Sequence, residues 1–148
     1  MTIKEITVKI NIKSLLLSGI VAGIVIMIIG GGLVPIIGHQ MDEVLKSRLL
    51  PPLSGWDMAY FAFVSISNGI GVAALYVLIN NSIRSGLKAV VITSLAFWFF
   101  GYFLANGALV AYGFMPLGLT VIGTAWGILE LLAGTFAVSI LYRSKELQ

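Results

Sequence analysis

The sequence contains no cysteine and a single histidine, and charged residues make up only 10% of its 148 residues. Without cysteine the chain has no disulfide, thiolate nucleophile, Cys-ligated metal or dithiol redox chemistry. The lone His39 has no second histidine or cysteine with which to hold a metal ion, so no metal site is predicted. The charged fraction is far below the roughly 25% that soluble domains carry. The lack of cysteine excludes the small four-helix redox enzymes that use dithiols, and so apolar a chain would not stay dispersed in water.

Hydrophobic residues make up 59% of the chain, and they gather in four apolar segments at about 14–38, 56–79, 87–112 and 117–142. Each segment is long enough to cross a hydrocarbon core of about 30 Å as a helix. The sequence therefore predicts an all-α integral membrane protein, a four-transmembrane-helix bundle with short loops. Residues 14–142 form its single domain, after an N-terminal arm of residues 1–13 and before a short tail of residues 143–148.

The nine Lys and Arg residues lie mostly at the ends of these segments. Seven of them fall on the N-terminal arm, the second connection and the C-terminal tail, and two fall on the first connection. By the positive-inside rule this distribution predicts that both termini are cytoplasmic in a multi-pass protein of the cell membrane. The net charge of +3 is thereby explained as an orientation signal, and no nucleic-acid partner is predicted.

The first connection, from about His39 to Gly55, is the only one long enough to have a structure of its own. Apolar residues recur there at helical spacing among charged ones, at Met41, Val44, Leu45 and Leu49. This pattern predicts a surface helix in the first external loop. Ser54 and Asp57 then resemble a capping box that starts the second span.

The N-terminal arm has a different period, since Ile6, Val8, Ile10 and Ile12 alternate with polar residues. Strict alternation is typical of a strand, and a strand of this length is not stable unless it pairs with another chain. The alternative is an interfacial arm whose isoleucines rest on lipid. Both interpretations stay open.

Two of the segments carry glycines at spacings that let helices approach closely. They are Gly19, Gly23 and Gly30 in the first segment and Gly123, Gly127 and Gly134 in the fourth. We expect these residues to form helix-packing faces, and the shared spacing suggests that the first and fourth spans pack together.

Glu130 lies near the centre of the fourth segment, on the same helical face as Gly127 and Gly134. A carboxylate that faces lipid is costly, so this position predicts burial against other helices, with the side chain protonated. Asn68 is the expected hydrogen-bond partner, because it lies at the middle of the second segment. Asn106, nearer the outside end of the third, is a less favoured partner.

Two functions follow from this arrangement. In the first, Glu130, Asn68 and Asn106 hold helices together, and the protein is an accessory or assembly subunit of a larger membrane complex or a homo-oligomer. In the alternative, Glu130 is the proton carrier of a small proton-coupled transporter or permease. No nucleophile–base pair or paired carboxylates are apparent, so neither an enzyme activity nor a cofactor is predicted.

Overall fold

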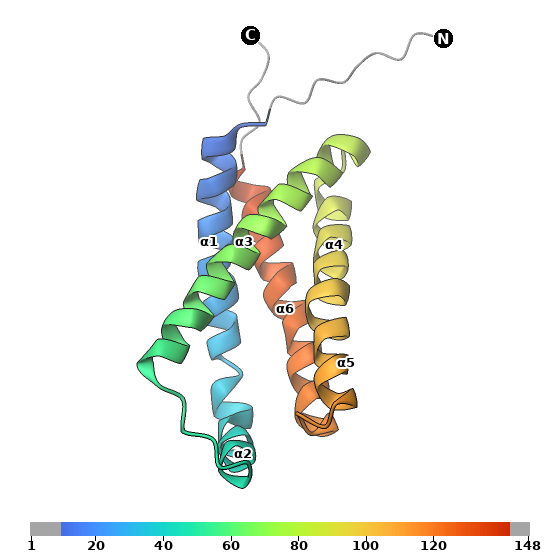
Figure 1. The fold of residues 1–148 in the computed structure, drawn as a ribbon. Coiled ribbons are helices and arrows are strands. Elements are labelled where there is room, and N and C mark those ends of the chain that lie inside the picture. Colours follow the sequence, from blue (N-terminus) through green and yellow to red (C-terminus); the bar gives the residue numbers. More distant parts are fainter. Residues whose placement is uncertain (1–9, 143–148) are drawn as a thin grey trace, which may run out of the picture.

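The computed structural model describes residues 10–142, and this part of the chain forms helices without any strand. Four helical segments are long and apolar enough to cross a membrane: Ile12–Gly31, Gly55–Ile83, Gly86–Ala111 and Leu117–Leu141. The prediction of four apolar spans is confirmed. The start of the first span, the end of the fourth and the connection between the second and third lie at one end of the bundle (Figure 1).

The first span is helix α1 (Ile12–Gly31), and its predicted end at residue 38 is wrong. Three consecutive glycines end the helix, each costing roughly 1 kcal/mol relative to alanine. The amide of Gly32 donates to the carbonyls of Ile28 and Ile29, at 3.2 and 3.0 Å. A new helix, α2 (Val34–Ser47), then begins with Pro35 in its first turn. Backbone amides in the first turn have no acceptor within the helix, so proline, which lacks the amide proton, loses no hydrogen bond there.

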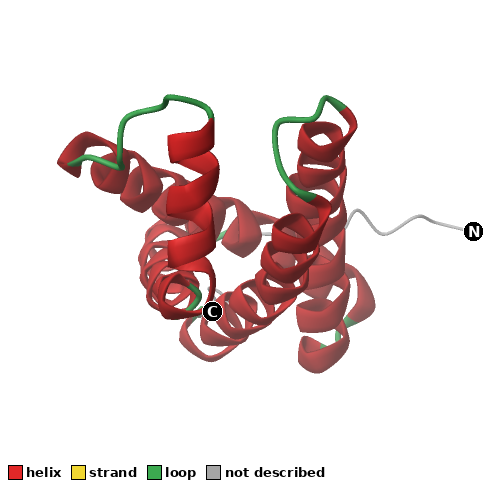
Figure 2. Cartoon of the chain, turned by 90° about the horizontal axis from the view of Figure 1, so that it is seen from below, coloured by secondary structure: helices red, strands yellow, loops and turns green. Residues whose placement is uncertain are grey.

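Helix α2 is the helix expected in the first connection, but it starts at Val34 and not near residue 39. Figure 2 looks along the bundle and shows α2 from the side, so α2 runs across the end of the bundle. The Arg48 side chain ties this region to the turn before the fourth span, since Nη2 donates to the Gly113 carbonyl at 2.6 Å.

Helix α3 (Gly55–Ile83) starts where the capping box was predicted, and the Ser54 amide donates to Oδ2 of Asp57 at 2.7 Å. It extends four residues past the predicted end at residue 79 and stops at Arg84, whose φ of 49° is left-handed. With 29 residues it is the longest helix. In Figure 1 it crosses the bundle obliquely, and such a tilt accommodates a helix longer than the membrane is thick.

The third span has three parts: α4 (Gly86–Phe97), a π-helix η1 (Trp98–Phe103) and α5 (Leu104–Ala111). A short turn leads from it to α6 (Leu117–Leu141), with Gly113 at a φ of 72°. The predicted ends of these two spans, at 112 and 142, are each within one residue of the observed ends.

The core lies in the half of the bundle near the start of α1. Its apolar members come from α1, α3, α4 and α6 and are Ala22, Ile26, Val72, Ala73, Tyr76, Val77, Ala89, Val90, Leu131 and Val138. The other half is loosely packed, because neither η1 nor α5 contributes a buried residue and the buried residues of α3 begin at Gly69.

The strand pattern of the N-terminal arm falls mainly on residues 1–9, which lie outside the described residues. The boundary at residue 13 is wrong, because Ile12 and Lys13 form the first turn of α1. Asn11 caps this helix by accepting a hydrogen bond from the Ser14 amide at 3.2 Å.

Candidate functional site

The third span faces α6 along a line of polar side chains that we call the polar seam. Its members on the third span are spaced four residues apart and hydrogen-bond to α6: Ser94, Trp98, Tyr102 and Asn106. Polar contacts of this kind between membrane helices fix their register and contribute about 0.6 to 2 kcal/mol each. The polar seam is the largest cluster of candidate functional groups among the described residues.

Three of its contacts use hydroxyl, amide and indole groups. Ser94 Oγ donates to Thr135 Oγ1 at 2.9 Å in a fully buried setting. Trp98 Nε1 donates to the Thr124 carbonyl at 2.7 Å, and Asn106 Nδ2 donates to the Thr124 hydroxyl at 2.9 Å. Thr124 therefore accepts hydrogen bonds from two side chains of the third span.

The fourth contact joins the two ionisable side chains of the polar seam, Tyr102 and Glu130. The Tyr102 hydroxyl donates to Glu130 Oε2 at 2.7 Å, and the Glu130 residue is only 8% exposed. Glu130 is the only acidic residue inside the four spans apart from Asp57 in the first turn of α3. Burial against neighbouring helices is the environment that an intramembrane carboxyl requires.

Two glycines make room for this pair. A Cβ atom added at Gly127 would fall on the Tyr102 ring, 2.6 Å from Cε1. On the other side, a Cβ atom at Gly30 would lie 3.3 Å from Glu130 Oε1. The carboxyl group therefore sits between η1 and the last turn of α1.

The π-helix explains how side chains four residues apart keep facing one neighbour. In an α-helix the direction of a side chain would rotate by about 80° between residues 98 and 106. A π-helical turn contains more residues, so the rotation is smaller and Trp98, Tyr102 and Asn106 all reach α6. Short π-helical segments occur frequently at functional sites.

A second link joins α6 to the broken end of the first span. Trp126 Nε1 donates to the Ile29 carbonyl at 2.9 Å. The Ile29 carbonyl already accepts from the Gly32 amide, and the indole is a second donor to the same oxygen, which has two lone pairs. The end of α1 is thus held against α6 one turn away from Glu130.

Asn68 does not pair with Glu130, and its side chain forms no hydrogen bond with any described residue. The adjacent Gly69 lies against Gly23, whereas Glu130 lies against Gly30. Along α1, Gly23 and Gly30 are about 10 Å apart, so Asn68 lies at a different depth from Glu130. Asn106 bonds to Thr124 and likewise does not reach Glu130.

The predicted packing glycines separate into different environments. Gly19 and Gly23 lie against α3, where an added Cβ atom would be 2.7 Å from Ile70 Cα and 2.8 Å from the Ser65 carbonyl oxygen, respectively. Gly134 lies against Ile26 of α1, at 2.8 Å from Cγ1. A Cβ atom at Gly123 would meet nothing within 4 Å. Helices α1 and α6 do pack together, but Gly19 and Gly23 are not the glycines that join them.

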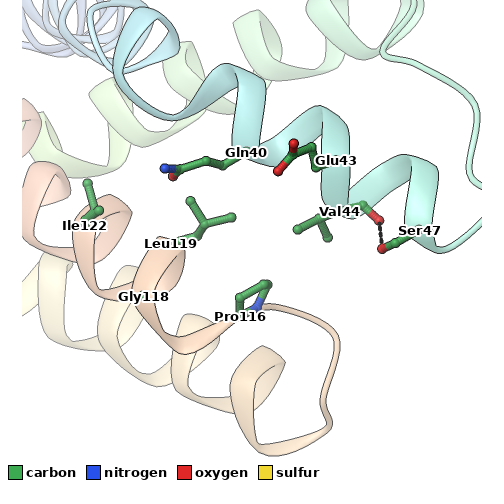
Figure 3. A pocket seen from close by; sticks show the side chains of 8 residues that line it. All are labelled: Gln40, Glu43, Val44, Ser47, Pro116, Gly118, Leu119 and Ile122. Carbon is green, nitrogen blue, oxygen red and sulfur yellow. Dashed lines mark hydrogen bonds between the residues drawn. The ribbon is translucent and has the colours of Figure 1, made fainter.

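A groove of about 570 Å³ separates α2 from the start of α6. Figure 3 shows Gln40 and Glu43 from α2 facing Leu119 and Ile122 from α6 across it. Glu43 Oε1 already lies 3.7 Å from Nδ1 of His39, one turn earlier in α2. The groove is wide open and brings no group of catalytic or metal-binding side chains together.

Within residues 10–142, no three His, Cys, Asp or Glu side chains are close enough to hold a metal ion. The chain matches no protein-family model, no curated protein and no solved structure.

Four members of the site were not predicted from the sequence: Ser94, Trp98, Tyr102 and Thr124. A signal was present, because three of these residues and Asn106 occur at intervals of four along the third span. Among so many apolar residues, a polar line of this kind is a stronger indicator of a helix interface than Asn106 alone.

Proposed function

We propose that the protein acts by association, as an accessory or assembly subunit of a larger complex in the cell membrane, with both termini cytoplasmic. The polar seam holds its own helices in register, and a partner packs on the loosely packed half of the bundle.

The observation that carries this proposal is that the polar groups inside the spans, apart from Asn68 and Thr93, are used within the chain. Glu130, Asn106, Trp98 and Ser94 all bond to neighbouring helices. Of the buried side-chain polar atoms in the described part of the chain, the Thr93 hydroxyl alone lacks a partner. A site for a polar substrate needs several convergent groups that are not already paired.

The loosely packed half supplies the surface for a partner. In the first half of α3, Phe61 is 51% exposed and lies two turns before Asn68, on the same side of the helix. On the same side again, Gly71 packs against the Phe97 ring, so the third span covers this side of α3 at Gly71 and leaves it open at Phe61. A partner helix placed there would bury Phe61 and give Asn68 a hydrogen-bond partner.

The first test is to extract the protein from its native membrane in mild detergent and determine the mass and composition of the particle. We expect a particle much larger than the 15.8 kDa chain, with other subunits present reproducibly. Phe61→Ala should release those subunits, because it removes an exposed ring from the proposed contact face.

Phe63→Ala is the matched control, since Phe63 is 68% exposed but points to nearly the opposite side of α3. It should leave the particle intact. A monomer, a particle made of this chain alone, or equal loss of subunits in the two variants would contradict the proposal.

A second candidate is proton-coupled transport, which one observation favours. The two departures from α-helical geometry within the spans, the end of α1 and the π-helix η1, both lie against Glu130. Interrupted helices often form the binding sites of transporters. In this function Glu130 exchanges a proton, and Tyr102 passes it on.

Proton flux into liposomes driven by a potassium diffusion potential, followed with a pH-sensitive dye, tests this candidate. Transport requires that the wild-type protein conduct protons and that Glu130→Gln abolish the flux, because an amide cannot release a proton at neutral pH. Flux that survives Glu130→Gln would exclude Glu130 as the carrier. No flux in the wild-type protein, together with an intact complex, would favour the accessory role.

A further inference from the structure

A second groove, of about 360 Å³, lies at the opposite end of the bundle, between the start of α1 and the end of α6. Its mouth carries the polar residues Asn11, Lys13 and Ser14. Its stem is mainly apolar, with Leu17 and Val21 from α1 and Leu141 from α6, and the one polar residue there, Ser18, bonds through its hydroxyl to the Leu15 carbonyl. The groove is thus amphipathic along the direction in which α1 crosses the membrane.

The length of the groove matches one leaflet of a bilayer. From Asn11 to Val21 is about 15 Å along a helix, and the hydrocarbon core of one leaflet is half of about 30 Å. A molecule with a polar head beside Lys13 and a chain beside Leu17 and Val21 would therefore lie as a membrane lipid lies. A partner helix would be expected to contact the full length of α1, whereas this groove ends at Val21.

The positive charges near the groove favour a lipid with an anionic head group. Lys13 is exposed and forms no ion pair with any described residue. The described cations Arg84 and Lys88 lie at the same end, in the connection between α3 and α4 and in the first turn of α4. The acidic residues Asp42, Glu43 and Asp57 lie on α2 and the first turn of α3, at the other end.

We propose that this groove binds one anionic phospholipid, with the phosphate at Lys13 and one acyl chain along Leu17, Val21 and Leu141. Basic pockets between membrane helices recognise anionic head groups in this way. The lipid would lie in the groove between α1 and α6, whether or not the protein has a partner subunit.

Native mass spectrometry of the protein purified from equimolar phosphatidylglycerol and phosphatidylcholine vesicles tests the proposal. We expect one retained phospholipid, with phosphatidylglycerol favoured about fivefold by the Lys13 charge. The Lys13→Gln variant should retain the two lipids in nearly equal amounts. Lys88→Gln removes the same charge from the same end but outside the groove, and it should preserve the preference.

Leu17→Trp fills the stem of the groove and should release the lipid of either type. Soluble glycerol phosphate should not displace the lipid, because it lacks the acyl chain that the stem holds. The proposal is overturned if the wild-type protein retains no lipid, if Lys13→Gln and Lys88→Gln lose the preference equally, or if Leu17→Trp releases a protein subunit and no lipid.

Discussion

Replacing Gly69 by alanine is expected to destabilise the protein more than any other single-methyl addition, by about 2 kcal/mol or more. The added Cβ atom would overlap the backbone of α1, at the Gly23 amide nitrogen and the Gly19 carbonyl oxygen. Backbone atoms on both helices cannot rotate away as a side chain does. The clash can be relieved only if α1 and α3 move apart along their whole contact.

Gly123→Ala is the matched control, because it adds the same methyl group to a helix where nothing lies within 4 Å. Alanine is a better helix former than glycine by roughly 1 kcal/mol, so this variant should be as stable as the wild-type protein or slightly more stable. Unfolding in mixed micelles with increasing SDS, followed by tryptophan fluorescence, measures both variants. Equal stability of the two variants would show that α1 and α3 do not cross at Gly69.

This pair of glycines also shows how far the sequence predicts the packing. Gly123 belongs to the expected packing face of the fourth span, yet an added Cβ atom there would meet nothing within 4 Å. The first span also differs from the expectation, because α1 ends at Gly31, beside Trp126. Span lengths follow from hydropathy alone, but the end of α1 depends on Gly30–Gly31–Gly32 and on the partners that its last carbonyls find.

Gly69 was not predicted, although Ser65, Gly69 and Ala73 repeat a small residue every fourth position in α3. The same spacing in the first span, Gly19 and Gly23, was recognised but assigned to contact with the fourth span. A small-residue pattern identifies a face that can pack closely, but it does not identify the helix that packs on it. The partner is determined by how the four helices tilt, which the sequence does not encode locally.

The same limit explains the wrong partner for Glu130. Equal positions along two helices mean equal depths only if both helices have the same tilt, and α3, which carries Asn68, is oblique and longer than α6, which carries Glu130. Burial of Glu130 could be predicted because it depends on the cost of a carboxyl in hydrocarbon. The identity of Tyr102 as its partner could not, since it depends on the π-helix that directs Tyr102 towards α6.

The second large effect is expected from breaking the contact between Glu130 and Tyr102. Tyr102→Phe keeps the ring against Gly127 but leaves the buried carboxyl without its hydrogen bond, and Glu130→Leu leaves the Tyr102 hydroxyl without an acceptor. Each variant should lose about 1 to 3 kcal/mol of unfolding free energy, the penalty for a buried polar group left unpaired. Glu130→Gln should lose less than about 1 kcal/mol, because its amide oxygen still accepts from Tyr102.

A double-mutant cycle separates this contact from the effects of side-chain size. If the hydrogen bond accounts for the loss, the Tyr102→Phe and Glu130→Leu variants are not additive, and the coupling is about 1 kcal/mol. Tyr112→Phe, at a residue that is 76% exposed, controls for the loss of a tyrosine hydroxyl and should be neutral. Additive losses would mean that Glu130 and Tyr102 stabilise the bundle independently, and the polar seam would then lack its central contact.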